Sequence, residues 1–371
     1  MSNMLDTLDS VLIMGPGPLS VHPRIYQALA KPTLGHMDPQ LFTLMDAIKE
    51  KLREVMDTKN EATIALSGTG SSGMEAVMVN LVEEGESMLV ITNGYFSERM
   101  AEVARRVGAQ VDTLDFPWGS PLDVAAIAKK LKEKSYKHVG MVHGETSTGV
   151  LNPVGEVGKL AKEAGAFFIV DAVTTLGGNE FHADGWHIDA LYSCSQKCIG
   201  SIAGLSPVTF SARAMEKIAA RKRKVPNFYL DMILLMKYWS GSPRTYHHTA
   251  SSNMFYGLYE ALQLIHEEGV GKVCARHMET HEYLVSSLGQ MGLSLLVEKP
   301  HRLPNLNTVL IPEGVDDAAV RKELRQNYKI EIGAGLGTLG GKIWRIGIMG
   351  HMARKENVDT LLAALKKILG R

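Results

Sequence analysis

The stretch from Asp189 to Gly204, DALYSCSQKCIGSIAG, contains the lysine around which the rest of the chain can be interpreted, Lys197. The apolar residues 190–192 predict a short buried strand, and the polar run SCSQ leads from it to Lys197 and a glycine-rich exit. A desolvated lysine fixed at a strand end stays partly neutral and can attack a carbonyl to form a Schiff base. Because a single lysine after a strand is usually a solvated surface residue, other segments must support this interpretation.

Apolar strands and amphipathic helices alternate around this stretch. The predicted strands cover 63–66, 88–92, 111–114, 139–142, 166–170 and 190–192, and the predicted helices cover 39–56, 98–107, 124–134 and 155–164. This alternation is typical of an α/β fold with a mostly parallel sheet and helices on both faces.

The composition changes after Gly269. Helices are expected over 254–267, 270–291, 317–327 and 356–369, and strands over 294–297, 308–311, 330–332 and 342–348. With 371 residues the chain exceeds one ordinary core. We therefore expect an N-terminal arm (1–20), a large domain (21–265) and a smaller C-terminal α+β domain (266–371).

Charge and cysteine content limit the function classes. The 40 basic and 40 acidic residues give a net charge of zero, so no long-range field favours nucleic acid or an anionic membrane. No apolar run is long enough to span a bilayer, and the first 23 residues contain two aspartates but no lysine or arginine, unlike a targeting peptide. Three cysteines without zinc-site spacing indicate a reducing compartment, so we expect a cytoplasmic protein.

Three polar residues near the middle of the chain could be drawn as a metal set. His182, Asp184 and His187 have a spacing that fits neither one helix face nor one side of a strand. The sequence therefore predicts polar loop residues there and no metal.

A second informative stretch, TIALSGTGSSGMEA, covers residues 63–76. A short strand leads into a glycine- and hydroxyl-rich loop, and a helix is expected to begin near Met74. Free N–H groups and the dipole at a helix start favour a phosphate there. The loop also matches the dinucleotide pattern GxGxxG, but the next strand ends in Asn93 and Gly94, where a ribose-binding acid would be expected. We interpret the loop as an anion cradle.

Polar residues follow five of the predicted strands, and the carboxyl ends of such strands gather at one site. These exits are 67–73, 93–96, the HGETSTG run at 143–149, Asp171 and Lys197. Asp171 ends the apolar run FFIVD, where an unpaired carboxylate is disfavoured unless it meets a cation or a donor. The non-helical segment GPGP at 15–18 could also place its backbone, including Gly17, beside a ligand.

Pyridoxal phosphate requires three groups at once: a lysine for the Schiff base, an acid that keeps the pyridine nitrogen protonated and a cradle for the phosphate. The chain offers Lys197, Asp171 and Thr69-Gly70-Ser71 in these roles, with Phe96 and Thr146 for the ring. The combination is more specific than any of its parts.

Six blocks, SGTGSSGMEA, HGETSTGVLNP, IVDAVTTLGG, YSCSQK, PRTYHHT and WRIGIMG, resemble those of the alanine-glyoxylate and serine-pyruvate aminotransferases. These are class V aminotransferases among the fold type I pyridoxal phosphate enzymes, and the resemblance runs from residue 15 to about residue 359. It implies a large domain with a mostly parallel seven-stranded sheet, a smaller C-terminal domain, and a homodimer with shared sites. The implied reaction is ping-pong transfer of the amino group of a small amino acid, alanine or serine, to glyoxylate or pyruvate.

The resemblance also implies residue roles. Lys197 would be the catalytic lysine and Asp171 the partner of the pyridine nitrogen, while Arg345, with Gly17, would bind the substrate carboxylate. The other cofactor contacts would be Thr69, Gly70, Ser71, Phe96, Thr146 and Gln196, with Tyr246 and Thr249 reaching the neighbouring subunit's phosphate.

The chain departs from the family pattern at three places. Phe96 replaces the tryptophan of many relatives, Ser71 replaces the histidine of some, and Ile202-Ala203 replaces a Pro-Pro pair.

The alternative functions left open are a cysteine desulfurase or lyase, another class V substrate such as 3-hydroxykynurenine or 2-aminoethylphosphonate, a dehydrogenase, and a non-catalytic binding protein.

Overall fold

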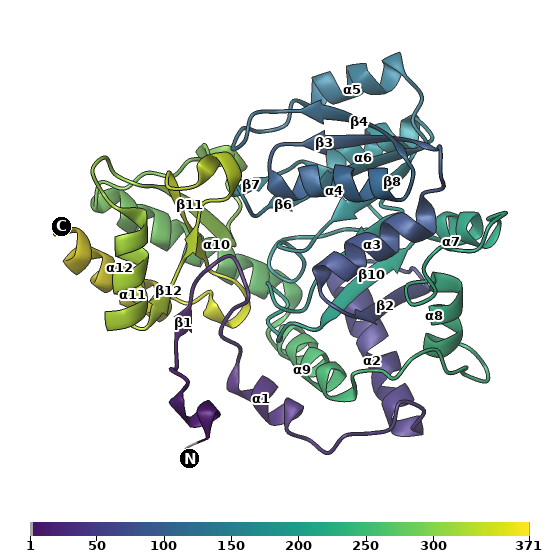
Figure 1. Ribbon diagram of the computed structural model, residues 1–371, viewed down its shortest axis with the longest axis horizontal. Helices are drawn as coiled ribbons and strands as arrows, with labels where there is room; N and C mark the ends of the chain where they lie inside the picture. The colour runs from purple at the N-terminus through teal and green to yellow at the C-terminus, as the bar shows by residue number, and fades with distance from the viewer. Residues whose placement is uncertain (1–2, 371) are drawn as a thin grey trace.

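A seven-stranded sheet forms the centre of the computed structural model, which describes residues 3–370 (Figure 1). The strand order is β2-β10-β9-β8-β5-β3-β4, and every neighbouring pair is parallel except the two pairs that include β10. The bounds are β2 Ala62–Ser67, β3 Ser87–Thr92, β4 Gln110–Asp115, β5 His138–Val142, β8 Phe167–Asp171, β9 Ala190–Tyr192 and β10 Leu205–Phe210. The predicted mostly parallel α/β sheet is confirmed, and β10 is an antiparallel strand that the sequence analysis missed.

Helices cover both faces of this sheet (Figure 1). Their bounds are α1 Pro23–Leu29, α2 Pro39–Met56, α3 Gly70–Leu81, α4 Tyr95–Arg106, α5 Val124–Glu133, α6 Val154–Glu163, α7 Ala212–Ala219, α8 Met232–Trp239 and α9 Ser252–Glu268. The helix predicted over 39–56 matches α2, because its apolar residues recur every three or four positions and face the core. Phe168, Ile169 and Leu191 on the central strands are completely buried.

The C-terminal part has its own antiparallel sheet, ordered β11-β14-β13, and a second apolar core. Its elements are α10 Val270–Gln290, β11 Leu306–Leu310, α11 Asp317–Asn327, β12 Ile330–Glu331, β13 Gly333–Ala334, β14 Ile343–Gly347 and α12 Lys355–Leu369. Trp344 and Leu361 are completely buried in that core. The strand predicted over 294–297 is wrong: only Leu295 forms an isolated bridge, with Val309, because the segment turns away after one residue of pairing.

The N-terminal segment crosses to the C-terminal part (Figure 1). Strand β1, Leu12–Ile13, pairs in parallel with β12, and the carbonyl of Met14 accepts a hydrogen bond from the N–H of Gly347. The GPGP segment follows directly, so this pairing sets its position. The short hairpin of β6, Gly144–Glu145, and β7, Val150–Leu151, lies in the HGETSTG run.

Candidate active site

One cavity of about 210 Å³ lies at the carboxyl ends of the parallel strands. It is lined by Gly17, Thr69, Gly70, Ser71, Met74, Phe96, Arg99, Val142, Thr146, Asp171, Val173, Tyr192, Gln196 and Lys197. All five predicted polar strand exits contribute to this lining, because parallel strands end at the same edge of the sheet. Nine of the sequence-predicted residues therefore meet in one place, although they span 181 positions, from 17 to 197.

Lys197 is almost completely buried in this cavity, with 9% of its surface exposed. Its Nζ donates a hydrogen bond to the carbonyl of Pro16. Burial, the largest effect, lowers the pKa of the Lys197 amine, and the charge of Arg345 acts in the same direction. This shift favours the neutral amine that a nucleophile or a general base needs.

The GPGP segment comes close to Lys197. Gly17 has a φ of +102°, and a Cβ added there would lie 2.6 to 2.9 Å from the end of the Lys197 side chain. Position 17 therefore favours glycine, because the backbone is in the left-handed region and because a Cβ would meet the Lys197 side chain. The role of the Pro16 carbonyl was missed in the sequence analysis, since a backbone acceptor leaves no side-chain signal.

Asp171 ends β8 and is 3% exposed. Its Oδ1 accepts a hydrogen bond of 2.8 Å from the N–H of Val173. Burial raises the pKa of the Asp171 carboxyl to about 7, since the charged form loses its hydration. The buried hydroxyl of Tyr192 lies beside this carboxyl and acts to lower the Asp171 pKa, but burial has the larger effect. The Asp171 carboxyl thus has no cation in hydrogen-bond contact. A protonated ring nitrogen could supply that cation.

The predicted anion cradle is the first turn of α3. This helix begins at Gly70 rather than near Met74, because the Gly-Ser-Ser-Gly residues themselves form the first turn. Thr69 is the N-cap, and its hydroxyl makes no capping hydrogen bond, so it is free for a ligand. Gln196 lines the same cavity, and its Oε1 is buried without a hydrogen-bond partner in the described part of the chain. The free N–H groups at the start of α3, together with the Thr69 and Gln196 side chains, fit a phosphate.

Glu145 connects the first turn of α4, which carries Phe96, to the segment that carries Thr146. Its completely buried carboxylate accepts hydrogen bonds from the N–H groups of Phe96 at 3.2 Å and of Ser97 at 3.0 Å. It also accepts one from the Ser147 hydroxyl at 2.6 Å. The carboxylate lies at the start of α4, where the helix dipole favours a negative charge. The sequence analysis missed Glu145, although a carboxylate within the predicted HGETSTG exit was the available signal.

Arg345 lies beside the cavity but does not line it. Its Nε donates to the carbonyl of Ala334 at 2.7 Å and its Nη1 to the carbonyl of Thr146 at 3.3 Å. Nη2 has no acceptor in the described residues. Burial lowers the pKa of Arg345 to about 10, so the guanidinium is still charged at neutral pH.

Tyr246 and Thr249 lie outside this cavity. Tyr246 is 54% exposed, and its ring contacts that of His36 with centroids 5.0 Å apart, while Thr249 is exposed. Within one chain the structure therefore does not bring these two predicted residues to the others.

The cavity residues fit pyridoxal phosphate. A partly neutral lysine, a buried acid without a cation and a helix start with free donors correspond to the aldehyde, the ring nitrogen and the phosphate of that cofactor. Phe96 offers an aromatic face, with the Arg99 guanidinium 5.1 Å from its ring centre, and Thr146 offers a hydroxyl that is hydrogen bonded to Thr174 at 2.9 Å.

Comparisons with known proteins agree with this chemistry. The family model described as aminotransferase class-V matches residues 24–361. An alanine-glyoxylate aminotransferase of Drosophila melanogaster is 38% identical over 97% of this chain and 92% of its own length. An (S)-ureidoglycine-glyoxylate transaminase of Bacillus subtilis is 38% identical over 97% and 90%, respectively. The crystal structure of an alanine-glyoxylate aminotransferase from Nostoc sp. superimposes with a TM-score of 0.96 at 48% identity, covering 98% of this chain and 96% of that one.

The matched segment includes every predicted cavity residue except Gly17, and the fold agrees over nearly the whole length. Geometry and comparison thus lead to the same cofactor chemistry. The chain belongs to the class V aminotransferases and is a pyridoxal-phosphate-dependent aminotransferase of fold type I.

Proposed function

We propose that this aminotransferase moves the amino group of a small amino acid, alanine or serine, to glyoxylate or pyruvate by a ping-pong mechanism. The observation that carries the proposal is the convergence of Lys197, Asp171 and the start of α3 on one small cavity. The relatives named for glyoxylate support the acceptor.

Lys197 is the proposed catalytic base and acid. Lys197 lines the cavity, and burial lowers the pKa of its amine, which favours the neutral form that can take a proton from the substrate Cα. The Pro16 carbonyl accepts a hydrogen bond from Nζ and so positions the amine, because both the neutral and the protonated amine carry N–H donors.

When bound, pyridoxal phosphate supplies an aldehyde that condenses with amines and a ring that withdraws the electron pair released with the Cα proton. Asp171 would hold the proton on the ring nitrogen. The positive charge of the protonated ring nitrogen would favour the ionised form of Asp171 and would offset the cost of burying that carboxylate. The first turn of α3, with Thr69 and Gln196, would hold the phosphate, and Phe96 and Thr146 would contact the ring.

Arg345 is the proposed carboxylate ligand. Two of its nitrogens are fixed by backbone carbonyls, so Nη2 is the one left for a substrate oxygen. A guanidinium held in this way orients the carboxylate, which fixes the direction of the Cα–H bond. Gly17, opposite Lys197, would leave room for a small substrate.

The cysteine arrangement disfavours a cysteine desulfurase. Cys194 and Cys198 are buried, and burial raises the pKa of the Cys194 thiol to about 12. Cys274, on α10, is partly buried, and its pKa is raised to about 11. None of the three has the accessible thiolate that nucleophilic attack on sulfur requires.

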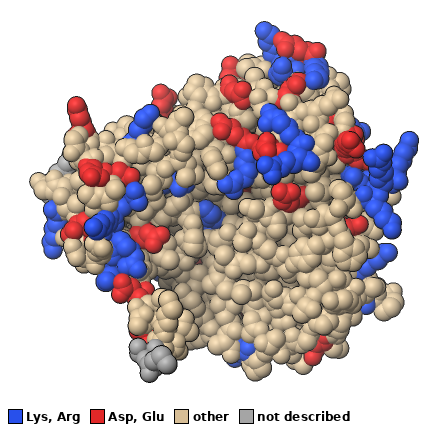
Figure 2. Space-filling model, in the orientation of Figure 1, with Lys and Arg blue, Asp and Glu red and all other residues tan. Residues whose placement is uncertain are grey.

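We also propose a homodimer with shared active sites. Phe228, Tyr229 and Tyr246 are exposed aromatics, and the Tyr229 hydroxyl donates to the carbonyl of Ser67, next to the proposed phosphate cradle. Figure 2 shows that the lower right of this face carries few charged side chains. Exposed aromatic side chains, a surface with few charges and a site that lacks its predicted Tyr246 and Thr249 within one chain together favour a second copy.

Mixing two inactive variants tests the shared site. Lys197→Ala and Tyr246→Ala should each lose activity as pure proteins. Refolding or exchanging them together should restore activity, since half of the mixed sites combine Lys197 of one copy with Tyr246 of the other. A mixture with no more activity than its components contradicts shared sites, and sedimentation gives the number of copies directly.

No helix among residues 3–370 combines the length and apolarity that crossing a membrane demands. The three cysteines, all free thiols, suit a reducing compartment, and we propose the cytoplasm.

The substrates are tested on the purified holoenzyme with single turnovers. Alanine or serine should bleach the visible absorption of the cofactor fastest, and glyoxylate or pyruvate should restore it faster than 2-oxoglutarate does. Preference for 3-hydroxykynurenine, 2-aminoethylphosphonate or another larger donor would overturn the substrate assignment but not the aminotransferase chemistry. Sulfide release from cysteine would instead contradict the reaction type.

A further inference from the structure

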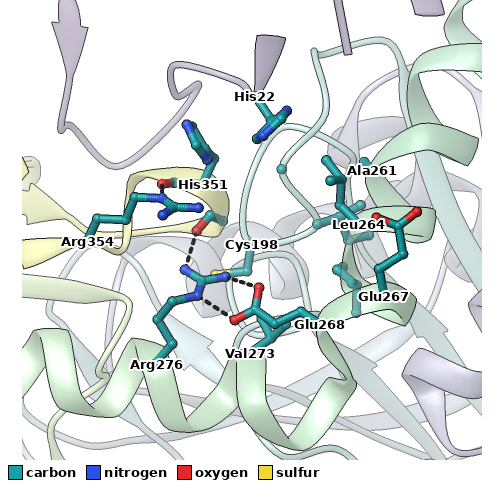
Figure 3. Close-up of a pocket in the computed structure, with 14 residues that line it drawn as sticks. His22, Cys198, Ala261, Leu264, Glu267, Glu268, Val273, Arg276, His351 and Arg354 are labelled. Atoms are coloured by element: carbon teal, nitrogen blue, oxygen red, sulfur yellow. Dashed lines mark hydrogen bonds and ion pairs between the residues drawn. The ribbon is translucent and has the colours of Figure 1, made fainter. Parts of the chain in front are cut away.

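A second cavity, of about 270 Å³, is lined by the residues that directly follow Lys197 in the chain and has no part in the proposed reaction (Figure 3). We call it the junction cavity, because it lies where the turn of residues 198–200 meets α9, α10 and the loop of residues 350–354. It is lined by His22, Cys198, Ile199, Gly200, Ala261, Leu264, Ile265, Glu267, Glu268, Val273, Arg276, Gly350, His351 and Arg354. The turn is closed by a hydrogen bond of 2.9 Å from the Gly200 N–H to the Lys197 carbonyl, so it separates the two cavities.

Most charges around the junction cavity are paired. Arg276 forms two hydrogen bonds, of 2.6 and 2.9 Å, with the Glu268 carboxylate, and its Nη1 also donates to the carbonyls of Gly350 and Ala353. Glu267 is held by the guanidinium of Arg24. Neither acid is therefore left to attract a cationic ligand.

Arg354 is the exception. Its Nε donates to the carbonyl of His351 at 3.2 Å, and its two terminal nitrogens have no acceptor anywhere in residues 3–370. In Figure 3 its guanidinium extends toward the middle of the cavity, next to His351. The lining therefore carries, at its exposed edge, one guanidinium that forms no ion pair within hydrogen-bond distance in the described chain and whose two terminal nitrogens are free to donate.

His22 adds a neutral donor. Its Nδ1 accepts a hydrogen bond of 3.1 Å from the N–H of Arg24, so the proton of the neutral ring is on Nε2. That Nε2 has no partner in the described chain. The His22 and His351 rings meet edge to face with centroids 4.7 Å apart. Burial lowers the pKa of both rings, that of His351 to about 4, so both are neutral near pH 7.

The opposite wall, on α9, presents alkyl side chains next to the carboxylate of Glu267, which is paired with Arg24. Ala261 and Leu264 of α9 lie across the cavity from Arg354 and His351 in Figure 3, with Cys198 between the two sides. Sulfate or free phosphate, which is hydrated on every side, would leave this wall without a partner. A short carboxylate matches both walls, because its charged end suits a guanidinium and its carbon end suits an alkyl surface.

We propose that the junction cavity binds a small monocarboxylate anion, with Arg354 and Nε2 of His22 on the carboxylate and Ala261 and Leu264 against its carbon end. This site is distinct from the active site and does not depend on the proposed substrates. The turn that follows Lys197 forms the wall between the two sites.

Binding is measured by ¹⁹F NMR of trifluoroacetate added to the holoenzyme. We expect saturable broadening and a shift of the signal, reversed by propionate but not by sulfate at the same ionic strength. Arg354→Gln should weaken this binding about tenfold or more, and Arg354→Lys, which keeps the charge, should weaken it less. His22→Asn should also weaken it, because asparagine keeps the helix-capping acceptor but cannot reach as far.

Matched controls locate the signal. Arg106 is an exposed arginine of α4 paired only with Glu102, so Arg106→Gln should bind trifluoroacetate as the wild type does. Arg354→Gln should keep the wild-type turnover and cofactor absorption, which separates a loss at this site from a loss at the active site. Unchanged affinity in Arg354→Gln would refute the site, and equal displacement by sulfate and propionate would refute its carboxylate class.

Discussion

The two sides of the turn after Lys197 differ in how their charges are satisfied. On the active-site side, Lys197 and Asp171 are buried without a charged partner in hydrogen-bond contact, and their pKa values move toward the neutral forms. On the junction side, Arg276 and Glu268 form a two-bond ion pair. Unpaired buried groups cost stability, so their presence marks the side on which a ligand completes the structure.

This comparison predicts that substitutions on the active-site side change activity more than stability, and that substitutions in the paired cluster do the reverse. Substitutions at four residues test it, from the largest expected effect to the smallest.

Lys197→Ala removes the proposed base and acid. Transamination should fall by about 10³-fold or more, since general acid-base catalysis alone contributes up to about 10⁴. Borohydride should also no longer attach the cofactor to the chain, as intact mass spectrometry would show. Lys129→Ala, at an exposed lysine of α5 that is 80% accessible, is the control and should behave as the wild type. Substantial activity in Lys197→Ala would move the reaction to another residue.

Asp171→Asn keeps the shape of the side chain but removes its charge. Turnover should fall by about 10²-fold or more, because a neutral amide cannot hold the proton on the ring nitrogen. Assays at saturating cofactor separate this effect from weaker cofactor binding.

The same substitution has a pH-dependent effect on the stability of the cofactor-free protein. The Asp171 pKa is about 7 when folded against 3.8 for the unperturbed group, so the folded state alone binds the proton between these values. The free energy of unfolding of the wild type should therefore fall, relative to Asp171→Asn, as pH rises from about 4 to 7, and the gap should stay constant above that. Urea unfolding at several pH values measures it. A gap that is flat with pH would mean that Asp171 is already ionised in the folded state.

Gly17→Ala places a Cβ against the Lys197 side chain. We expect a loss of activity of about tenfold or more, because a displacement of the reacting amine by about 1 Å can cost as much as 10²-fold. Gly314→Ala is the matched control: Gly314 has a φ of +78°, but no atom lies within 4 Å of the added Cβ. Both variants should lose about 1 kcal/mol of stability from backbone strain, and only Gly17→Ala should lose activity. Equal activities would show that Gly17 does not set the position of Lys197.

Arg276→Gln breaks the ion pair on the junction side. It should lower the free energy of unfolding by about 2 kcal/mol, since Glu268 and the carbonyls of Gly350 and Ala353 lose their donor. Turnover of the folded enzyme should stay within about threefold of the wild type. Thermal unfolding and steady-state assays on one preparation measure both quantities. If turnover fell by more than the loss of folded protein explains, the junction side would contribute to catalysis.

Much of the fold was predictable because its signals are local. The period of α2 and the alternation of apolar strands with helices each lie within a short window, and both were confirmed. The antiparallel strand β10 was missed, since Pro207 lies within it and its pairing with β2 is a long-range choice. The strand predicted over 294–297 is wrong for the opposite reason. The local apolar alternation is present, but the segment forms only one isolated β-bridge, between Leu295 and Val309.

The candidate site also contains residues that local sequence signals predicted and residues whose roles depend on long-range packing. Residues that follow strands, such as Asp171 and Lys197, could be chosen from the sequence, because a parallel sheet brings its carboxyl ends together. The Pro16 carbonyl and the carboxylate of Glu145 could not be assigned their roles. Their contacts depend on how separate loops pack, and a backbone acceptor has no residue type to recognise.

By itself the sequence determined the sheet class and the cofactor and singled out Lys197 as the proposed catalytic lysine, because each inference depends on residue types placed at strand ends. Only the tertiary structure decided that Gly17 must approach Lys197, that α3 begins at Gly70, and that one turn separates an active site with unpaired charges from a cavity in which only Arg354 is unpaired. The physical reason is that burial and pairing are properties of the folded chain: the same lysine or arginine is solvated, paired or isolated according to what the fold places beside it.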